Sequence, residues 1–162
     1  MSRAFVKESD RTEPLPDIPL SEHPNWTTPA GLHRQQRRLA ELREAALQPR
    51  SLQDDAALQA IAREQRWLEA RIASANVVDP AQQPRDRVAF GATVEVVDEH
   101  GHEATYRIVG EDEADAEHGS VSWLSPLAKA VIGARVGDEV LWRRPAGDLR
   151  VEILAIRYED AP

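Results

Sequence analysis

The sequence predicts an α+β protein, in which an N-terminal antiparallel helical coiled coil precedes an antiparallel sheet with one short helix. Three observations support this prediction. Apolar residues recur at helical spacing on both sides of Pro49, alternating strand patterns recur through residues 88–160, and one capped helix at 125–133 interrupts those strands. Helices bury their apolar stripes against each other, whereas a sheet with a helix on one face forms its own core.

Residues 1–27 contain four prolines among charged and small residues, with little apolar periodicity. Proline holds the residue before it in an extended conformation, and a segment poor in apolar residues cannot bury enough surface to order itself. We therefore expect a disordered, proline-rich lead.

Residues 28–79 are expected to form the helical hairpin. Thr28 suits a helix cap, Pro29 suits the first helical position, and Pro49 ends the first helix. The spacing of 3 and 4 residues between core positions is that of a coiled-coil seam. The seam residues are Leu32, Gln35, Leu39, Leu42 and Ala46 in the first helix, and Leu58, Ile61, Gln65, Leu68 and Ile72 in the second. Each arm should be roughly 30 Å long at 1.5 Å per residue.

The remainder divides into a linker at 80–87 and a sheet domain at 88–160. Strand patterns cover 88–97, 103–109, 139–142 and 149–158, and a further strand is expected between Ser120 and the capped helix. The acidic run 110–119 is expected to be a loop. Ser125 and Pro126 cap the short helix, and Gly133 ends it.

Composition narrows the function classes. The chain has 162 residues, 41% of them hydrophobic, which is enough for one domain or two small ones. It has no cysteine, which excludes disulfides and thiolate chemistry. No apolar run approaches the ~20 residues that span a bilayer, and no signal-peptide pattern is visible. We expect a cytoplasmic protein without membrane contact.

The net charge of −8 is unevenly distributed. Residues 81–162 carry nine basic against sixteen acidic side chains, whereas residues 28–80 are close to neutral. Such an acidic half repels nucleic acid phosphates and fits a basic protein surface better.

Five segments in register resemble the GreA/GreB family of bacterial transcription elongation factors. They are FGATVEV (90–96), YRIVGEDEAD (106–115), SPLAKAVIG (125–133), VGDEV (136–140) and PAGDLRVEILAI (145–156). The resemblance implies a coiled-coil domain and an FKBP-like C-terminal domain. It also implies a monomer that is not itself an enzyme, binds core RNA polymerase at the rim of the secondary channel, and meets nucleic acid only within the transcription complex. Ser125, Pro126 and Leu127 would contact polymerase, although Ser125 and Pro126 are also explained as a helix cap.

The hairpin tip departs from the family pattern. Cleavage-active members carry tip carboxylates that hold a magnesium ion in the polymerase active site, and here only Asp54 and Asp55 are candidates. A pair formed by Ser51 and Asp54 also resembles a helix cap, and acidic residues in a first turn favour the helix dipole. The arms are also shorter than the family pattern by about two turns, or ~10 Å. We therefore expect polymerase binding without transcript cleavage, no cofactor, and magnesium only if the tip reaches the active site.

Several alternatives stay open at this point. Arg34, Arg37 and Arg38 would contact polymerase or RNA, or they form a solvated helix face. A working cleavage factor that uses Asp54 and Asp55 is the main alternative function. A prolyl isomerase is suggested only by the FKBP-like resemblance, and fold alone does not carry function. The aromatic residues that such a site would need are more simply explained as core; they are Phe90, Tyr106, Trp123, Trp142 and Tyr158.

Overall fold

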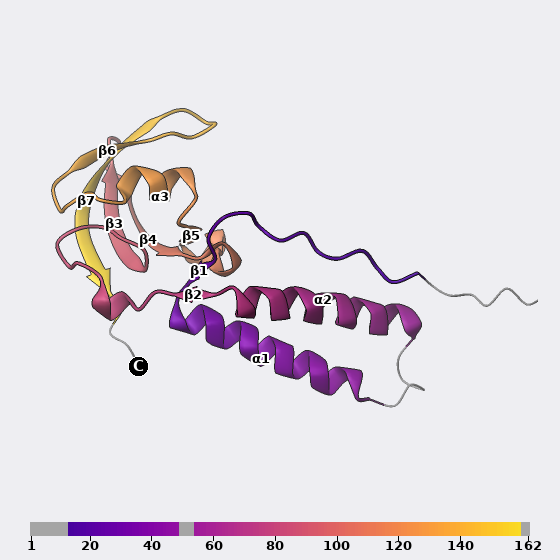
Figure 1. Cartoon of the computed structure of the whole chain (residues 1–162). Coiled ribbons are helices and arrows are strands. Elements are labelled where there is room, and N and C mark those ends of the chain that lie inside the picture. Colours follow the sequence, from indigo (N-terminus) through magenta and orange to yellow (C-terminus); the bar gives the residue numbers. More distant parts are fainter. Residues whose placement is uncertain (1–12, 49–53, 160–162) are drawn as a thin grey trace, which may run out of the picture.

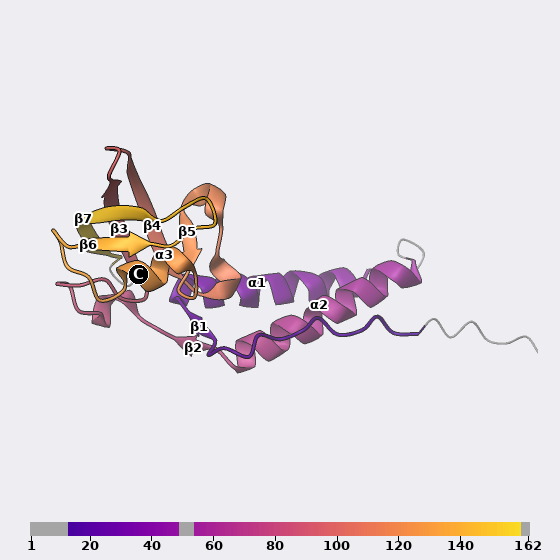
Figure 2. The same cartoon turned by 90° about the horizontal axis from the view of Figure 1, so that it is seen from above.

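The computed structural model describes residues 13–48 and 54–159 as a helical hairpin joined to a small curled sheet (Figure 1). The hairpin extends away from the sheet (Figures 1 and 2). The helices are α1 (Pro29–Ala46), α2 (Asp55–Ala73) and α3 (Pro126–Val131). The strands are β1 (Trp26–Thr27), β2 (Asn76–Val77), β3 (Ala92–Asp98), β4 (Glu103–Val109), β5 (Ser120–Ser122), β6 (Glu139–Trp142) and β7 (Leu149–Tyr158).

Both helices of the hairpin begin where the local sequence can cap them. The hydroxyl of Thr28 accepts a hydrogen bond from the Gly31 amide at 3.1 Å, so α1 starts at Pro29 as predicted. The two helices run antiparallel and bury Leu39 and Leu42 of α1 against Leu68 of α2. At 18 and 19 residues, the arms are about 27–29 Å long.

The root of the hairpin is closed by a short parallel pair, β1 with β2. Trp26 lies opposite Asn76 and Thr27 opposite Val77. The chain therefore enters and leaves the hairpin through two segments that are hydrogen-bonded to each other.

The sheet has the strand order β5-β4-β3-β7-β6 and is mixed. The expectation of a wholly antiparallel sheet is wrong at one edge, because β5 pairs parallel with β4. Residues 110–119 make two 3-10 turns, η3 (Glu111–Glu113) and η4 (Ala116–His118), which carry the chain back to lie beside Arg107, in the second half of β4. The chain then enters β5 in the same direction as β4. The predicted acidic loop is the crossover that makes this pairing possible.

The first sheet strand begins later than the pattern suggests. Val88 is buried, but its backbone pairs with Ala134 and Gly133 rather than with the sheet. Gly91 has a φ of +86°, a turn conformation that favours glycine, and β3 starts at the next residue. The apolar alternation therefore predicts correctly that Val88 is buried, but wrongly that it belongs to the strand.

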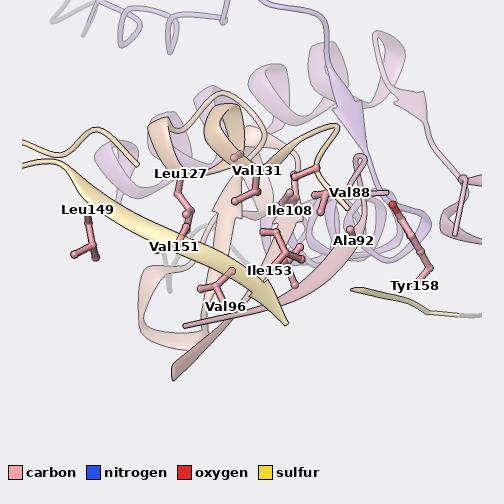
Figure 3. Packing of buried hydrophobic residues seen from close by; sticks show 13 residues of the cluster. Val88, Ala92, Val96, Ile108, Leu127, Val131, Leu149, Val151, Ile153 and Tyr158 are labelled. Atoms are coloured by element: carbon pink, nitrogen blue, oxygen red, sulfur yellow. The ribbon is translucent and has the colours of Figure 1, made fainter. Parts of the chain in front are cut away.

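The core of the sheet domain lies between α3 and the concave face of the sheet. Leu127 and Val131 of α3 lie over Val151 and Ile153 of β7 and Ile108 of β4 (Figure 3). Burial raises the pKa of Tyr158, whose hydroxyl donates to the Arg87 carbonyl at 2.6 Å. This core uses no side chain from the hairpin helices.

The described part of the N-terminal lead, residues 13–25, is extended and follows α2 (Figure 1). Arg66 of α2 binds the Asp17 carboxylate at 2.6 Å and the Leu15 carbonyl at 3.3 Å. The predicted disorder of the whole lead stays a prediction, since residues 1–12 lie outside the described residues. None of the helices in the described ranges is long and apolar enough to cross a membrane.

Candidate functional site

The start of α3 forms one end of the candidate surface. The Ser125 hydroxyl accepts from the Ala128 amide at 3.2 Å, which caps the helix, and Pro126 occupies the first helical position. Pro126 is exposed, whereas Leu127 is only 3% exposed and lies in the sheet core. Of the three predicted contact residues, Pro126 alone is exposed, Ser125 is half-buried and Leu127 is buried.

A shallow groove of about 330 Å³ lies beside Pro126, between α3 and β6. Lys129, Ala130, Leu141 and Arg143 line the rest of it. Leu141 is exposed, and within the described ranges neither Lys129 nor Arg143 forms an ion pair. The groove therefore combines apolar surface with two cations on the acidic half of the chain. Such a surface suits a protein segment that carries both an apolar and an acidic side chain.

The arginines of α1 have different surroundings. Arg38 makes a forked contact with Glu64 of α2 at 2.8 and 3.0 Å, and the hydrogen bond and charge of Glu64 raise the pKa of Arg38. Arg34 lies 3.6 Å from Glu113. Arg37 is exposed and forms no ion pair with a described residue. Two of the three arginines, Arg34 and Arg38, thus pair with acidic side chains of the protein itself.

The tip carboxylates of the hairpin have a structural explanation. Asp54 is itself the N-cap of α2, because its carboxylate accepts from the Ala57 amide at 2.6 Å. Asp54, rather than the predicted Ser51, is therefore the cap of α2. Ser51 itself lies outside the described residues. Asp55 is the first helical residue, so its charge lies near the positive end of the helix dipole.

The sequence does not reveal a polar contact between the sheet domain and the root of the hairpin. The Glu113 side chain is 5% exposed, and its carboxylate accepts from the amides of Thr28 and Gly110, each at 3.0 Å. It also accepts from the hydroxyls of Thr27, at 3.3 Å, and Thr28. A side chain from the predicted acidic loop thus lies at the N-terminus of α1.

The neighbouring Asp112 joins the same contact to both hairpin helices. Its carboxylate accepts from Arg71 of α2 at 2.6 Å and from Gln35 of α1 at 2.9 Å. The Arg71 side chain is 5% exposed and also donates to the Asn25 side chain at 2.7 Å. Gln35, predicted as a seam residue, instead reaches the sheet domain.

Aromatic side chains extend this junction. The Trp26 ring stacks on Trp123 with centroids 4.5 Å apart and meets Phe90 edge-on at 5.8 Å. Trp123, Trp142 and Tyr106 pack against the sheet core, and Phe90 and Tyr158 are buried. The aromatic residues are therefore used in packing.

The histidines near the β3–β4 turn have a local partner. His102 lies 3.3 Å from the Asp98 carboxylate, which also accepts from the backbone amides of His100 and His102. The His102 amide is the largest cause of a lowered pKa at Asp98. Within the described ranges, no group of three or more His, Asp or Glu side chains is placed to hold a metal ion.

Comparison with known proteins places the C-terminal part of the chain. A family model described as "Transcription elongation factor, GreA/GreB, C-term" matches residues 83–158. The transcription elongation factor GreA of Alkalilimnicola ehrlichii is 48% identical over 93 residues, which cover 56% of this chain and 59% of that protein. GreB of Neisseria meningitidis serogroup B is 46% identical over 94 residues, which cover 57% of this chain and 58% of that protein. The matches thus span less than two thirds of these relatives.

Two solved structures resemble a larger part of the chain, but more loosely. A prokaryotic transcription elongation factor GreA/GreB from Nitrosomonas europaea has a TM-score of 0.42 and 28% identity, over 83% of this chain and 99% of that one. The GreA factor homolog Gfh1 of Thermus thermophilus has a TM-score of 0.41 and 25% identity, over 83% and 99% of the two chains.

Proposed function

Because the chain belongs to the GreA/GreB family, we propose that it is a cytoplasmic regulator of transcription elongation that binds core RNA polymerase at the secondary channel without stimulating transcript cleavage. The sheet domain would correspond to the FKBP-like domain of the family and hold the rim of the channel. The hairpin would correspond to the coiled coil and point into the channel. The protein would act as a monomer and would not be an enzyme itself.

The binding half of this proposal rests on the surface around α3. Pro126 is exposed beside a groove in which Leu141 lies between two cations, Lys129 and Arg143. Ser125 would act by holding the start of the helix, and Leu127 by anchoring it in the core. Arg37 is the hairpin arginine most available to polymerase or nascent RNA, since Arg34 and Arg38 already have acidic partners.

The single observation that carries the absence of cleavage is the capping role of Asp54. Its carboxylate is bound to the Ala57 amide, and Asp55 follows it inside the helix. Asp54 is the N-cap and Asp55 the first helical residue, and no third His, Asp or Glu side chain of the described residues is placed to join them at a metal ion. Magnesium demands a nearly ideal octahedral set of oxygen ligands, which a carboxylate already bound to a backbone amide supplies poorly. The short arms support the same conclusion.

Binding is tested by retention of the protein on immobilised core polymerase. Replacing Pro126 with Asp puts a charge on the proposed surface and is compatible with the start of a helix, so P126D should fold and bind at least tenfold more weakly. P145D, in the exposed turn before β7, makes the same change away from the groove and should bind normally. Equal binding by P126D and P145D would remove α3 from the interface, and a wild-type protein that does not bind polymerase would end the proposal.

Cleavage is tested separately with arrested elongation complexes. The protein should leave transcript length unchanged at concentrations that saturate polymerase. Shortened transcripts that disappear with D54A/D55A would establish the alternative of a working cleavage factor, in which these residues hold magnesium.

A further inference from the structure

The acidic turn Glu111–Glu113 connects the sheet domain to the root of the hairpin, and we propose that it sets the direction of the hairpin relative to the sheet. Glu113 and Asp112 are then positioning residues, because they act through the hairpin rather than on a partner. The geometric part stands on the chain alone. Only its consequence for transcription rests on the proposed function.

Glu113 supplies the first fixed point. Its carboxylate is shared among the Thr28 amide, the Gly110 amide and two threonine hydroxyls, and Arg34 lies 3.6 Å away. The negative charge also lies at the N-terminus of α1, an 18-residue helix whose dipole favours it. A carboxylate with several donors is bound more strongly than a neutral acceptor, and these donors come from both sides of the junction.

Asp112 supplies the second fixed point and prevents rotation about the first. It contacts Gln35, two turns into α1, and Arg71, near the end of α2. Arg71 is in turn held by Asn25 on the segment that leads into the hairpin. Since a single contact would act as a pivot, contacts with two separate helices are what determine a direction.

The backbone packs closely around these contacts. A Cβ atom on Gly31 would lie closer than 3.0 Å to the Glu113 carboxyl group, and one on Gly110 would meet the Trp26 carbonyl. The stacked rings of Trp26 and Trp123 close the other side of the junction. Polar and aromatic contacts together hold the hairpin and the sheet in the arrangement seen here.

The junction also explains the acidic composition of this turn. The run from Glu111 to Glu117 does not converge on a common point that would hold a cation. Asp112 and Glu113 point to the hairpin, and Glu111 accepts from Ser21 at 3.1 Å on the lead. Each of the three carboxylates thus contacts a different part of the N-terminal half.

The proposal is tested by measuring the distance between hairpin and sheet in the free protein. The chain has no cysteine, so E44C on α1 and R150C on β7 give two unique sites for spin labels. Both side chains are exposed. Pulsed electron paramagnetic resonance should show one narrow distance distribution. The variant D112N/E113Q places amide donors opposite donors of the root, and it should at least double the width of the distribution.

The matched control is E117Q/D148N, which changes the net charge equally at two exposed side chains away from the junction. It should keep the narrow distribution. A distribution for D112N/E113Q as narrow as that of the control, with the near-ultraviolet signal of the folded protein intact, overturns the proposal. If the double variant loses that signal, D112N alone is measured against the same criterion, because it leaves the contacts of Glu113 in place.

Polymerase then separates the geometric part from the functional part. D112N/E113Q should bind core polymerase within twofold of E117Q/D148N, since the groove beside α3 is untouched, while its effect on elongation falls at least fivefold. An unchanged effect with a broadened distance distribution would show that hairpin direction does not matter for transcription. Loss of polymerase binding by the wild type would contradict the proposed function and leave the distance result intact.

Discussion

At Gly31, helix propensity and packing favour opposite outcomes of substitution. Alanine is a better helix residue than glycine by about 1 kcal/mol. A Cβ atom here, however, would collide with the Glu113 carboxyl group and the Thr27 hydroxyl. Glu113 cannot easily move aside, because several donors hold it. Packing should therefore decide whether alanine at position 31 stabilises or destabilises the protein.

We expect G31A to lower the free energy of unfolding by about 1–3 kcal/mol, the range for overpacking a closely packed site. Urea unfolding followed by circular dichroism measures it. The reverse change A40G, on the exposed face of α1, gives the propensity contribution alone and should cost about 1 kcal/mol. A G31A protein more stable than the wild type would mean that the junction yields easily.

Residues with local roles are the ones that the sequence predicts well. Thr28 and Ser125 cap their helices as expected, because a cap depends on residues within one turn. Glu113 is different, since its partner Thr28 lies 85 positions away. Three acidic residues in succession do not indicate which one is buried. The available signal was Gly31, a poor helix residue in the first turn of a well-capped helix, where glycine indicates close approach of another group.

Asp54 is the N-cap of helix α2, and this role has a measurable consequence. Replacing an aspartate N-cap with alanine costs about 1 kcal/mol, which corresponds to roughly a fivefold change in a local opening equilibrium. We expect D54A to speed hydrogen exchange about fivefold at Ala57 and Leu58 and to leave exchange near Leu68 unchanged. D55A removes only a favourable charge from the first turn and should have a smaller effect. Unchanged exchange in D54A would show that the cap is not used in solution.

The sequence predicts the three helices and the five strands of the main sheet in the right order. It predicts less well where the strands begin and end and which strands pair. The two errors in the sheet have different causes. Val88 reads as strand because it is apolar, although it is buried in a bend beside Ala134. The parallel pairing of β5 depends on the path of residues 110–119, and turn composition does not fix the direction in which the chain re-enters a sheet.

The molecule as a whole is unevenly stabilised. Thirteen buried residues form the core of the sheet domain, whereas three form that of the hairpin. Because the sheet core draws nothing from the hairpin helices, residues 79–159 should fold alone and melt cooperatively. Residues 13–78 should be mostly unfolded at 25 °C, since isolated short helices are marginal in water.

Circular dichroism of the two fragments measures this difference. A fragment 79–159 without near-ultraviolet tryptophan signal would contradict it. So would a stable, cooperatively melting hairpin fragment. The junction at Asp112 and Glu113 is then what lends order to the hairpin in the full chain.

The parallel pair of β1 and β2 has an evolutionary consequence. It brings the entrance and exit of the hairpin together, so everything between residues 28 and 75 is a closed excursion from the body of the protein. Turns can be added or removed in matching numbers at the far end while the base stays the same. Selection can therefore change the length of the hairpin helices without changing how the hairpin joins the sheet domain.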